Sequence, residues 1–162
     1  TSKTVSVLKD HILSDKEVVE LFGDKYFIDD TDVLEKWKIQ KGPKKIERTN
    51  KKTGEPYFFA EGGMAFPDHL DKPSRTIVTG EGGSGPSRFK HVIKSLQSGR
   101  FRRLTPIELE RLSMFPDNHT AVGINGPISD NVRAFFIGNA LVTGVITKIG
   151  KQLLKKVDEY GI

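Results

Sequence analysis

The stretch RRLTPIELERLSMFPD, residues 102–117, constrains the fold more than any other part of the chain. Thr105 is a good N-cap, Pro106 suits the first helical position, and Glu108 completes a T-x-x-E capping box. Pro116 cannot continue a helix, so the segment has to end near it. The sequence therefore predicts a short helix with both ends specified and an apolar side formed by Leu109, Leu112 and Met114.

Other segments predict short helices and strands in irregular order. One helix is expected from an N-cap at Ser14 to a stop at Gly23, and another over residues 32–39 with Trp37 on its apolar side. A further helical stretch starts at Ser129 and is interrupted at Gly138-Asn139. Residues 41–56 are expected to form an exposed loop, and strands are expected at 57–60, 75–79 and 89–94. The fold class that follows is α+β.

The charge distribution is compatible with a polyanionic partner. The 162 residues are enough for one domain, or for one domain and a fragment of another, and they carry a formal net charge of +5. Residues 36–52, KWKIQKGPKKIERTNKK, hold eight basic side chains against Glu47 alone. Such a segment either neutralises phosphates or is a solvated loop. We find no apolar run long enough to span a bilayer and expect no membrane partner.

The residues alone indicate no catalytic centre. The sequence has no cysteine, which excludes disulfides, thiolate zinc ligands and a cysteine nucleophile within it. Its four histidines lack metal-ligand spacing and are expected to be surface or polar-core residues, so no metal is predicted. No Asp or Glu is followed two residues later by Lys, and no nucleophile elbow occurs.

Three weaker patterns each allow two interpretations. The glycine-rich GEGGSG at residues 80–85 lacks the ending of a phosphate-binding P-loop, so it is either a flexible hairpin loop or a loop facing DNA. GNALV at residues 138–142 is either a glycine kink between helical segments or part of a site. Arg103, Glu108 and Arg111 could be a solvated set of ion pairs.

Taken together, RRLTPIELERLSMFPD and the later FFIGNALV resemble the ninth and tenth conserved motifs of DNA cytosine-5 methyltransferases. KDHILSDKEVVELF is similar to the segment that enters the small domain of these enzymes. SRTIVTGEGGSGPSRFKHVI is similar to the part of the target-recognition domain that holds a Thr-aliphatic pair and a glycine loop. The order of these segments agrees with the family as well as their residue types.

The resemblance implies roles for three sets of residues. The DNA-binding set comprises Arg75, Thr76, Ile77, Gly82, Gly83, Ser84, Ser87, Arg88 and Lys90. The ninth-motif residues, which organise the recognition domain, are Arg103, Thr105, Glu108, Arg111, Phe115 and Pro116, and we expect Glu108 to pair with Arg111. One wall of the S-adenosylmethionine pocket is formed by Gly138, Asn139, Ala140 and Leu141, although Ala140 replaces the serine of many relatives and so lacks its hydroxyl.

The resemblance also implies a division of the chain. Residues 1–128 would form the target-recognition domain, with the ninth motif at 102–117, and residues 129–162 a helical segment that packs on the Rossmann-like catalytic domain. The cofactor loop, the Pro-Cys nucleophile loop and the Glu-Asn-Val motif of the family normally precede this region. We therefore expect a split subunit or an excised C-terminal portion, inactive by itself.

The expected function is sequence recognition for a DNA cytosine-5 methyltransferase of the restriction-modification type. Its expected partners are double-stranded DNA and the cysteine-bearing catalytic half, with S-adenosylmethionine as the cofactor, in a prokaryotic cytoplasm. The alternative of another class is a stand-alone DNA-binding module such as a regulator. A structural interaction domain is a third possibility, but it leaves the glycine loop and the segregated lysines without a role.

Overall fold

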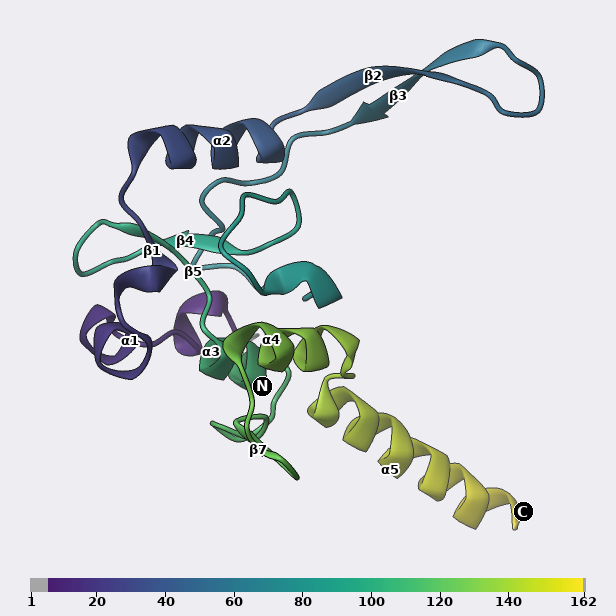
Figure 1. Cartoon of the computed structure of the whole chain (residues 1–162). Coiled ribbons are helices and arrows are strands. Elements are labelled where there is room, and N and C mark those ends of the chain that lie inside the picture. The colour runs from purple at the N-terminus through teal and green to yellow at the C-terminus, as the bar shows by residue number, and fades with distance from the viewer. Residues whose placement is uncertain (1–5, 162) are drawn as a thin grey trace.

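The computed structural model describes residues 6–161 as a mixture of helices and short strands, which agrees with the predicted α+β class. Its central sheet has three antiparallel strands in the order β1 (Phe27–Ile28), β5 (Phe101–Arg103) and β4 (Val92–Lys94) (Figure 1). Arg102 of β5 lies between Phe27 and Ile93 of the neighbouring strands. The middle of the sheet therefore carries a guanidinium group, which needs a buried partner.

The two helices expected in the first part of the chain are present. Helix α1 (Asp15–Phe22) has a reciprocal capping box between Ser14 and Glu17, and Gly23 follows it with φ of 72°. Helix α2 (Thr31–Lys41) is capped by Asp30 and buries Trp37 completely. Single 3-10 turns complete this part: η1 (Leu8–Asp10) and η2 (Asp24–Tyr26).

Helix α3 (Pro106–Leu112) occupies the centre of the molecule although it is short. Thr105 and Glu108 form the predicted capping box, and all five residues from Pro106 to Glu110 are buried. The carboxylate of Glu108 accepts hydrogen bonds from Arg102 at 2.7 and 3.0 Å, from the Leu13 amide at 2.8 Å and from the Thr105 amide at 2.6 Å. One carboxylate thus joins the start of α1, the central strand and the helix cap.

A second buried carboxylate joins α3 to the helix that follows. Glu110 is fully buried and accepts from Arg133 at 2.9 Å, from the Asn118 amide at 2.7 Å and from the Thr120 amide at 2.9 Å. Arg133 belongs to α4 (Asp130–Asn139), which begins after Ser129 as predicted. The Glu110 contacts fix the loop after α3 and the helix α4 to the same side chain.

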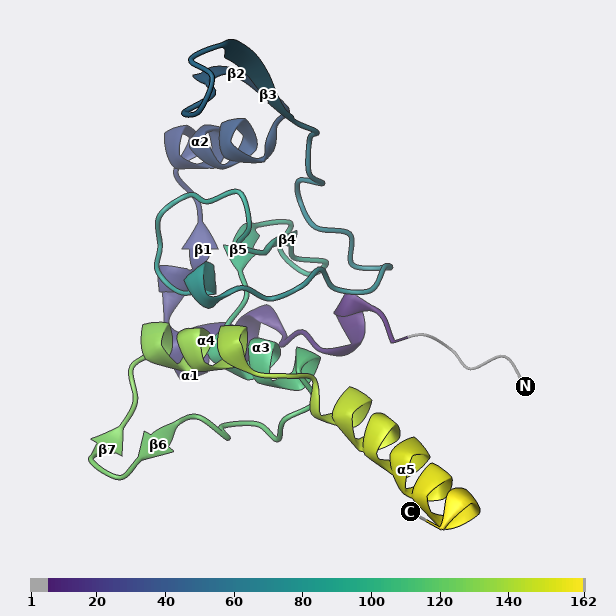
Figure 2. The same cartoon turned by 90° about the vertical axis from the view of Figure 1, so that its right-hand side faces the viewer.

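Apolar side chains fill three clusters around these charged groups. The largest gathers Leu8, Ile93, Leu104, Leu109, Ala134 and Ile137 between the sheet, α3 and α4. The second surrounds Val18 of α1, and the third surrounds Trp37 of α2. Helix α4 lies between the sheet and the turn formed by β6 (Val122–Gly123) and β7 (Gly126–Pro127) (Figure 2).

Helix α4 and the segment around η3 (Thr79–Glu81) approach each other backbone to backbone. A Cβ atom added to Gly138 would lie 2.5 Å from the main chain of Val78 and Thr79. At the other end of the contact, a Cβ atom on Gly82 would lie 3.0 Å from the Cα atom of Asn131. Two glycines therefore permit this close contact, because no side chain fits between the two segments.

Two sequence predictions in this region are wrong. Residues 41–56 are not one loop, because β2 (Lys44–Thr49) and β3 (Pro56–Glu61) pair as an exposed antiparallel hairpin. The sequence KKIERT is polar on both faces of the strand, so no alternation of apolar and polar residues marks it. Residues 75–79 form no strand, because their main chain runs against α4, which offers no ladder of hydrogen bonds.

The C-terminal helical stretch is divided, as the Gly138-Asn139 pair predicts. Helix α4 ends at Asn139 and α5 (Thr143–Tyr160) starts after a break of three residues. Within Asp130–Tyr160, a window of 18 residues with a mean hydropathy of 1.4 is apolar enough to cross a membrane by length and composition only, so the absence of a membrane partner stays a prediction. The α4 part of this stretch packs inside the molecule, whereas α5 projects from it.

Replacing Glu108 by alanine is expected to destabilise the chain by about 3–5 kcal/mol, because the buried Arg102 would lose both hydrogen bonds to a carboxylate and keep only Asp15, at 3.8 Å. Urea denaturation followed by circular dichroism measures the change. The matched control is Asp117→Ala, which breaks the exposed Arg111–Asp117 pair and should cost less than about 1 kcal/mol. Equal losses for the two variants would show that Glu108 is not the central contact.

Replacing Gly138 by alanine is expected to destabilise the chain by about 1–3 kcal/mol, because the new methyl group would overlap the main chain of Val78 and Thr79. Hydrogen exchange of the amides in residues 78–83 should accelerate together with this loss. Gly150→Ala is the control, since nothing lies within 4 Å of its added Cβ atom and alanine favours a helix. Unchanged exchange in Gly138→Ala would contradict the close contact.

Candidate nucleic-acid and cofactor surface

The glycine-rich segment after η3 is an ordered loop fixed through its main chain. The Gly83 amide donates to Asn131 of α4 at 2.8 Å, and the Gly83 carbonyl accepts from Arg103 at 2.8 Å and from Lys90 at 3.2 Å. Lys90 also donates to the Gly85 carbonyl at 3.0 Å. These contacts hold the backbone and leave the Ser84 hydroxyl at the edge of a cavity.

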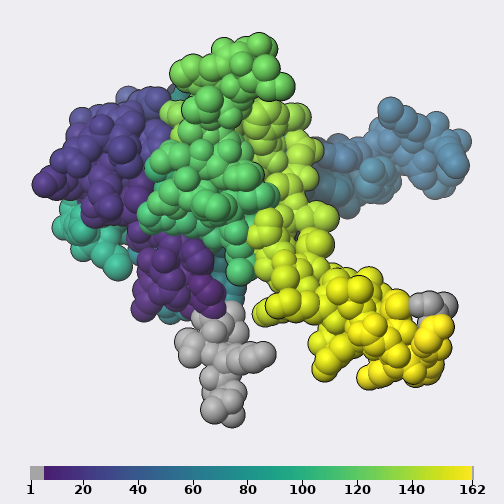
Figure 3. Space-filling view, turned by 90° about the horizontal axis from the view of Figure 1, so that it is seen from below, coloured from purple at the N-terminus to yellow at the C-terminus, as the bar shows by residue number. Residues whose placement is uncertain are grey.

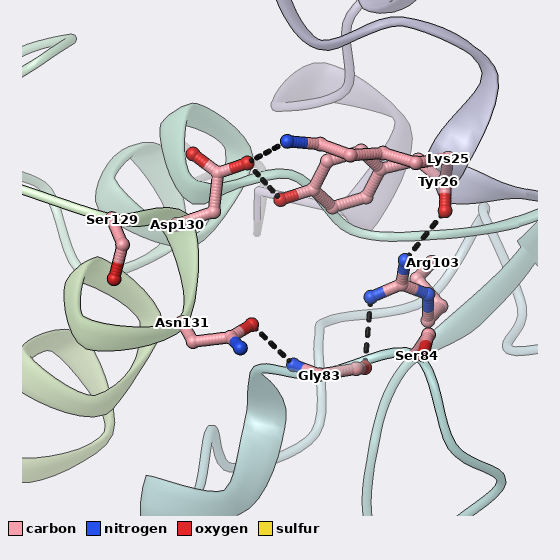
Figure 4. Close-up of a pocket in the computed structure, with 8 residues that line it drawn as sticks. All are labelled: Lys25, Tyr26, Gly83, Ser84, Arg103, Ser129, Asp130 and Asn131. Atoms are coloured by element: carbon pink, nitrogen blue, oxygen red, sulfur yellow. Dashed lines mark hydrogen bonds and ion pairs between the residues drawn. The ribbon is translucent and has the colours of Figure 1, made fainter.

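This cavity measures about 520 Å³ and lies between the loop, η2 and the start of α4 (Figure 4). Asp130 accepts from the Tyr26 hydroxyl at 3.1 Å and forms an ion pair with Lys25 at 2.7 Å. Burial and the neighbouring Asp130 raise the pKa of Tyr26, so the phenol stays protonated at neutral pH. The Arg103 guanidinium lies 4.7 Å from the centre of the Tyr26 ring. The cavity thus combines cationic and hydroxyl groups with one carboxylate that is already paired.

A second cavity, of about 260 Å³, brings together residues that the sequence assigned to different roles. Thr76 and Ile77 of the DNA-binding set line it together with Ala140 of the tenth motif and Val142. Ile77 also packs on the largest apolar cluster. The Thr-aliphatic pair and the end of α4 therefore share one surface, although more than sixty residues separate them in the sequence.

The three cations of the DNA-binding set are engaged inside the molecule. Arg75 pairs with Asp68 at 2.6 Å and donates to the carbonyls of Phe89 and Lys90. Arg88 donates to the carbonyls of Gln40, Gly42 and Gly62, at the base of the β2–β3 hairpin, and lies 3.4 Å from Glu61. Together with the bonds of Lys90 to the glycine loop, these contacts give all three side chains structural partners.

A buried polar cluster beneath the loop has no signal in the sequence. Glu81 accepts from both the backbone amide and Nδ1 of His91, at 2.6 and 3.0 Å, so His91 is one of the predicted polar-core histidines. Lys41 is buried 3.5 Å from Asp68, and burial lowers its pKa. Burial alone would raise the pKa of Asp68, but Arg75 and Lys41 hold it below its ordinary value. Charged groups far apart in the sequence therefore meet under the loop.

The ninth-motif residues form structural contacts, with two corrections. Arg103 bonds the carbonyls of Gly83 and Lys25, which ties the motif to the glycine loop. The expected Glu108–Arg111 pair is wrong, because Arg111 bonds Asp117 at 2.7 and 2.8 Å while Glu108 bonds Arg102. The ring of Phe115 stacks on His119. Helix α3 ends at Leu112, before Pro116 is reached, and the prediction that Met114 belongs to its apolar side is wrong, because Met114 follows the helix with φ of 61° and is exposed.

The tenth-motif residues and α5 present an uncovered surface. Asn139 is exposed and donates to the Phe135 carbonyl at 2.9 Å, and Leu141 is 68% exposed. Along α5 an apolar face with helical spacing is exposed at Val142, Val145, Ile146, Ile149, Leu153 and Val157. Figure 3 shows α5 projecting from the rest of the molecule. An exposed apolar face of this extent is typical of an interaction surface.

The described residues 6–161 contain no cluster of three or more His, Asp or Glu side chains that could hold a metal ion. The larger cavity is lined by cations, hydroxyls and main-chain groups, beside the paired carboxylate of Asp130. Such groups suit the binding of phosphates and base edges.

Comparison with known proteins identifies the family of the chain. The C-5 cytosine-specific DNA methylase family matches residues 3–155. The chain is 44% identical over 142 residues to the Type II methyltransferase M.Sau3AI of Staphylococcus aureus, an alignment that covers 88% of this chain and 32% of that protein. It thus spans about a third of the length of this relative. Members of the family are transferases that methylate DNA, and they use S-adenosylmethionine in general. The chain belongs to the C-5 cytosine-specific DNA methylase family.

Proposed function

We propose that this chain is the target-recognition portion of a DNA cytosine-5 methyltransferase, together with the helices that close its catalytic domain. The whole enzyme would transfer a methyl group from S-adenosylmethionine to C5 of a flipped cytosine. Residues 1–128 would recognise DNA, and residues 129–162 would pack on the Rossmann-like domain. Since its substrate is duplex DNA, we place the enzyme in the prokaryotic cytoplasm, with no membrane partner.

One observation carries this proposal: helix α4 contacts the glycine loop along its length and ends in the tenth motif. Gly82 and Gly138 both lie in the close contact between α4 and the loop segment, and Ala140 lines a cavity with Thr76 and Ile77. A methyltransferase has to align the base that it recognises with the methyl donor. A single rigid helix between the two surfaces supplies this alignment.

The recognition role is best supported for the residues whose polar groups remain available. Ser84 lines the larger cavity, and Thr76 and Ile77 line the smaller one. Hydroxyls can contact phosphates or base edges, and the Thr-aliphatic pair would lie beside the extruded base and its neighbours. Arg75, Arg88 and Lys90 would then support the loop, since their partners are carbonyls and carboxylates of the chain itself.

The end of α4 fits one wall of a cofactor pocket. Asn139 and Leu141 are exposed there, and the small side chain of Ala140 leaves space for a ligand but has no hydroxyl to bind it. S-adenosylmethionine, when bound, supplies the methyl group. The contribution of this chain would be the orientation of one side of that ligand through the Asn139 side chain and the main chain of residues 138–141.

The nucleophile has to come from outside these 162 residues, since the sequence contains no cysteine. The cysteine-bearing part of the enzyme is the occupant that we propose for the apolar face of α5. Extruding the cytosine from the duplex costs about a few kcal/mol, and contacts between the recognition loop and the flanking bases would offset this cost.

Methyl transfer is expected only when this chain is combined with a polypeptide that carries the cysteine-bearing part of the enzyme. Incorporation of labelled methyl groups into duplex DNA measures it, and each part alone should give background counts. Methylation by the isolated chain would contradict the proposal. A lack of activity in the mixture, with DNA binding by this chain retained, would favour a stand-alone DNA-binding module.

Asn139→Ala is expected to raise the KM for S-adenosylmethionine of the combined enzyme roughly tenfold, which corresponds to about 1.4 kcal/mol. Its duplex affinity should stay unchanged, because Asn139 lies at the cofactor end of α4. Asn125→Ala, in the exposed turn between β6 and β7, is the control and should alter neither quantity. A loss of DNA affinity in Asn139→Ala with an unchanged KM would contradict the assigned role.

A further inference from the structure

The arginines of the chain differ in whether their charge is neutralised. Six of the eight pair with a carboxylate: Arg75, Arg88, Arg100, Arg102, Arg111 and Arg133. Arg103 is buried and donates to two carbonyls. Among residues 6–161, Arg48 is the arginine that bonds neither a carboxylate nor a carbonyl, and it lies in the β2–β3 hairpin.

The whole hairpin shares this property. Its basic side chains are Lys44, Lys45, Arg48, Lys51 and Lys52, and none of them forms an ion pair within the part of the chain that the structure describes. Lys44 donates to the neutral amide of Gln40 at 2.9 Å. The hairpin has three acidic residues against these five cations: Glu61 faces Arg88, and among residues 6–161 Glu47 and Glu55 form no ion pair with the hairpin cations. The positive charge of the hairpin is therefore available to a partner.

Aromatic rings support two of these cations without neutralising them. The Arg48 guanidinium lies 4.0 Å from the centre of the Phe59 ring, and the Lys45 ammonium lies 4.6 Å from that of Phe58. Such contacts hold a long side chain in place and leave its charge intact. The hairpin therefore presents cations that are partly ordered before any partner binds.

The strand register distributes these cations over both faces of the hairpin. Arg48 lies opposite Tyr57 on one face, and Lys45 lies opposite Ala60 on the other. Lys51 and Lys52 are exposed at the tip. Lys45 shares its face with Glu47, so the excess of positive charge lies on the face of Lys44 and Arg48 and at the tip, where Lys51 and Lys52 outnumber Glu55. Such a row of cations suits the regularly spaced negative charges of a phosphate backbone.

The base of the hairpin is fixed to the glycine loop segment. Arg88, at the end of this segment, bonds the carbonyls of Gly42 and Gly62, which precede β2 and follow β3. The hairpin then extends from the molecule beside α2 (Figures 1 and 2). Its direction is therefore set relative to the loop that we propose to recognise DNA.

A nucleic acid fits this surface better than a protein does. Lysine is depleted at the centre of protein interfaces, whereas protein–DNA interfaces are strongly positive. A two-stranded ribbon alone is marginally stable in water, so a bound partner would also order it. Each strand is about 20 Å long, which corresponds to about six base pairs of duplex.

We propose that the β2–β3 hairpin is an arm that binds the phosphate backbone of the duplex beside the recognised site, independently of base sequence. The inference rests on the proposed function, because it requires that the chain acts on duplex DNA. It adds a contact surface outside the glycine loop and the tenth motif. The arm would raise the affinity of the chain for duplex DNA and help to position the chain on it.

The double variant Lys51→Ala/Lys52→Ala tests the arm, because both side chains are exposed at the tip and the fold does not depend on them. Fluorescence anisotropy of the full chain with a long duplex of mixed sequence gives the association constant at several salt concentrations. The slope of its logarithm against the logarithm of salt concentration should become shallower by about 2, and binding should weaken several-fold. Lys45→Ala/Arg48→Ala should act in the same direction.

The control is Lys9→Ala/Lys16→Ala, which removes the same charge from exposed positions near the N-terminus and should leave the slope unchanged. Equal slopes for the tip variant and the unmodified chain would overturn the proposal that the hairpin binds DNA. The proposed function would not be affected by that result, because methyl transfer tests it separately. Absence of duplex binding by the unmodified chain would overturn both. A tip variant that changes sedimentation of the chain but not DNA binding would instead indicate a protein contact and overturn the arm.

Discussion

The buried carboxylate of Glu108 is the contact on which the rest of the structure depends. A charged group without access to water needs partners on all sides, and Glu108 finds them in Arg102, Thr105 and the Leu13 amide. These bonds fix the central strand, the N-terminus of α3 and the start of α1 to one another. Glu110 binds Arg133 and so fixes α4 to α3, and the glycine loop packs against α4. The surface that we propose to recognise DNA therefore owes its position to two glutamates on a helix of seven residues.

Local signals in the sequence predict the helices well and the long-range contacts poorly. Ser14, Thr105 and Gly23 define helix ends because capping involves residues close in sequence. The partner of Glu108 could not be predicted, since a spacing of three residues on the helix favours Arg111 and only the fold brings Arg102 beneath the carboxylate. Strand β3 was expected from residues 57–60, but its partner β2 was missed because KKIERT has no alternation of apolar and polar residues. Residues 75–79 have strand composition but no strand beside them.

In the candidate site, too, the sequence indicated the segments involved but not the contacts that their side chains form. The sequence singled out the glycine loop and the GNAL segment, and in the structure the loop segment packs against α4 while GNAL lies at the end of that helix. Sequence alone could not show that Arg75 and Arg88 are occupied by Asp68 and by backbone carbonyls, because those partners lie up to 48 residues away. The available cations lie instead on the hairpin, where the sequence indicated only an excess of lysine.

The manner in which the glycine loop is held has a consequence for how such a domain can change. Asn131, Arg103 and Lys90 all bond to main-chain atoms of Gly83 or Gly85, so they depend on the path of the loop and not on its side chains. Substitutions at intervening positions such as Ser84 leave every one of these bonds intact. If the loop recognises DNA as we propose, a scaffold of this kind could acquire a new target sequence by exchanging a few side chains, while contacts elsewhere in the chain supply its stability.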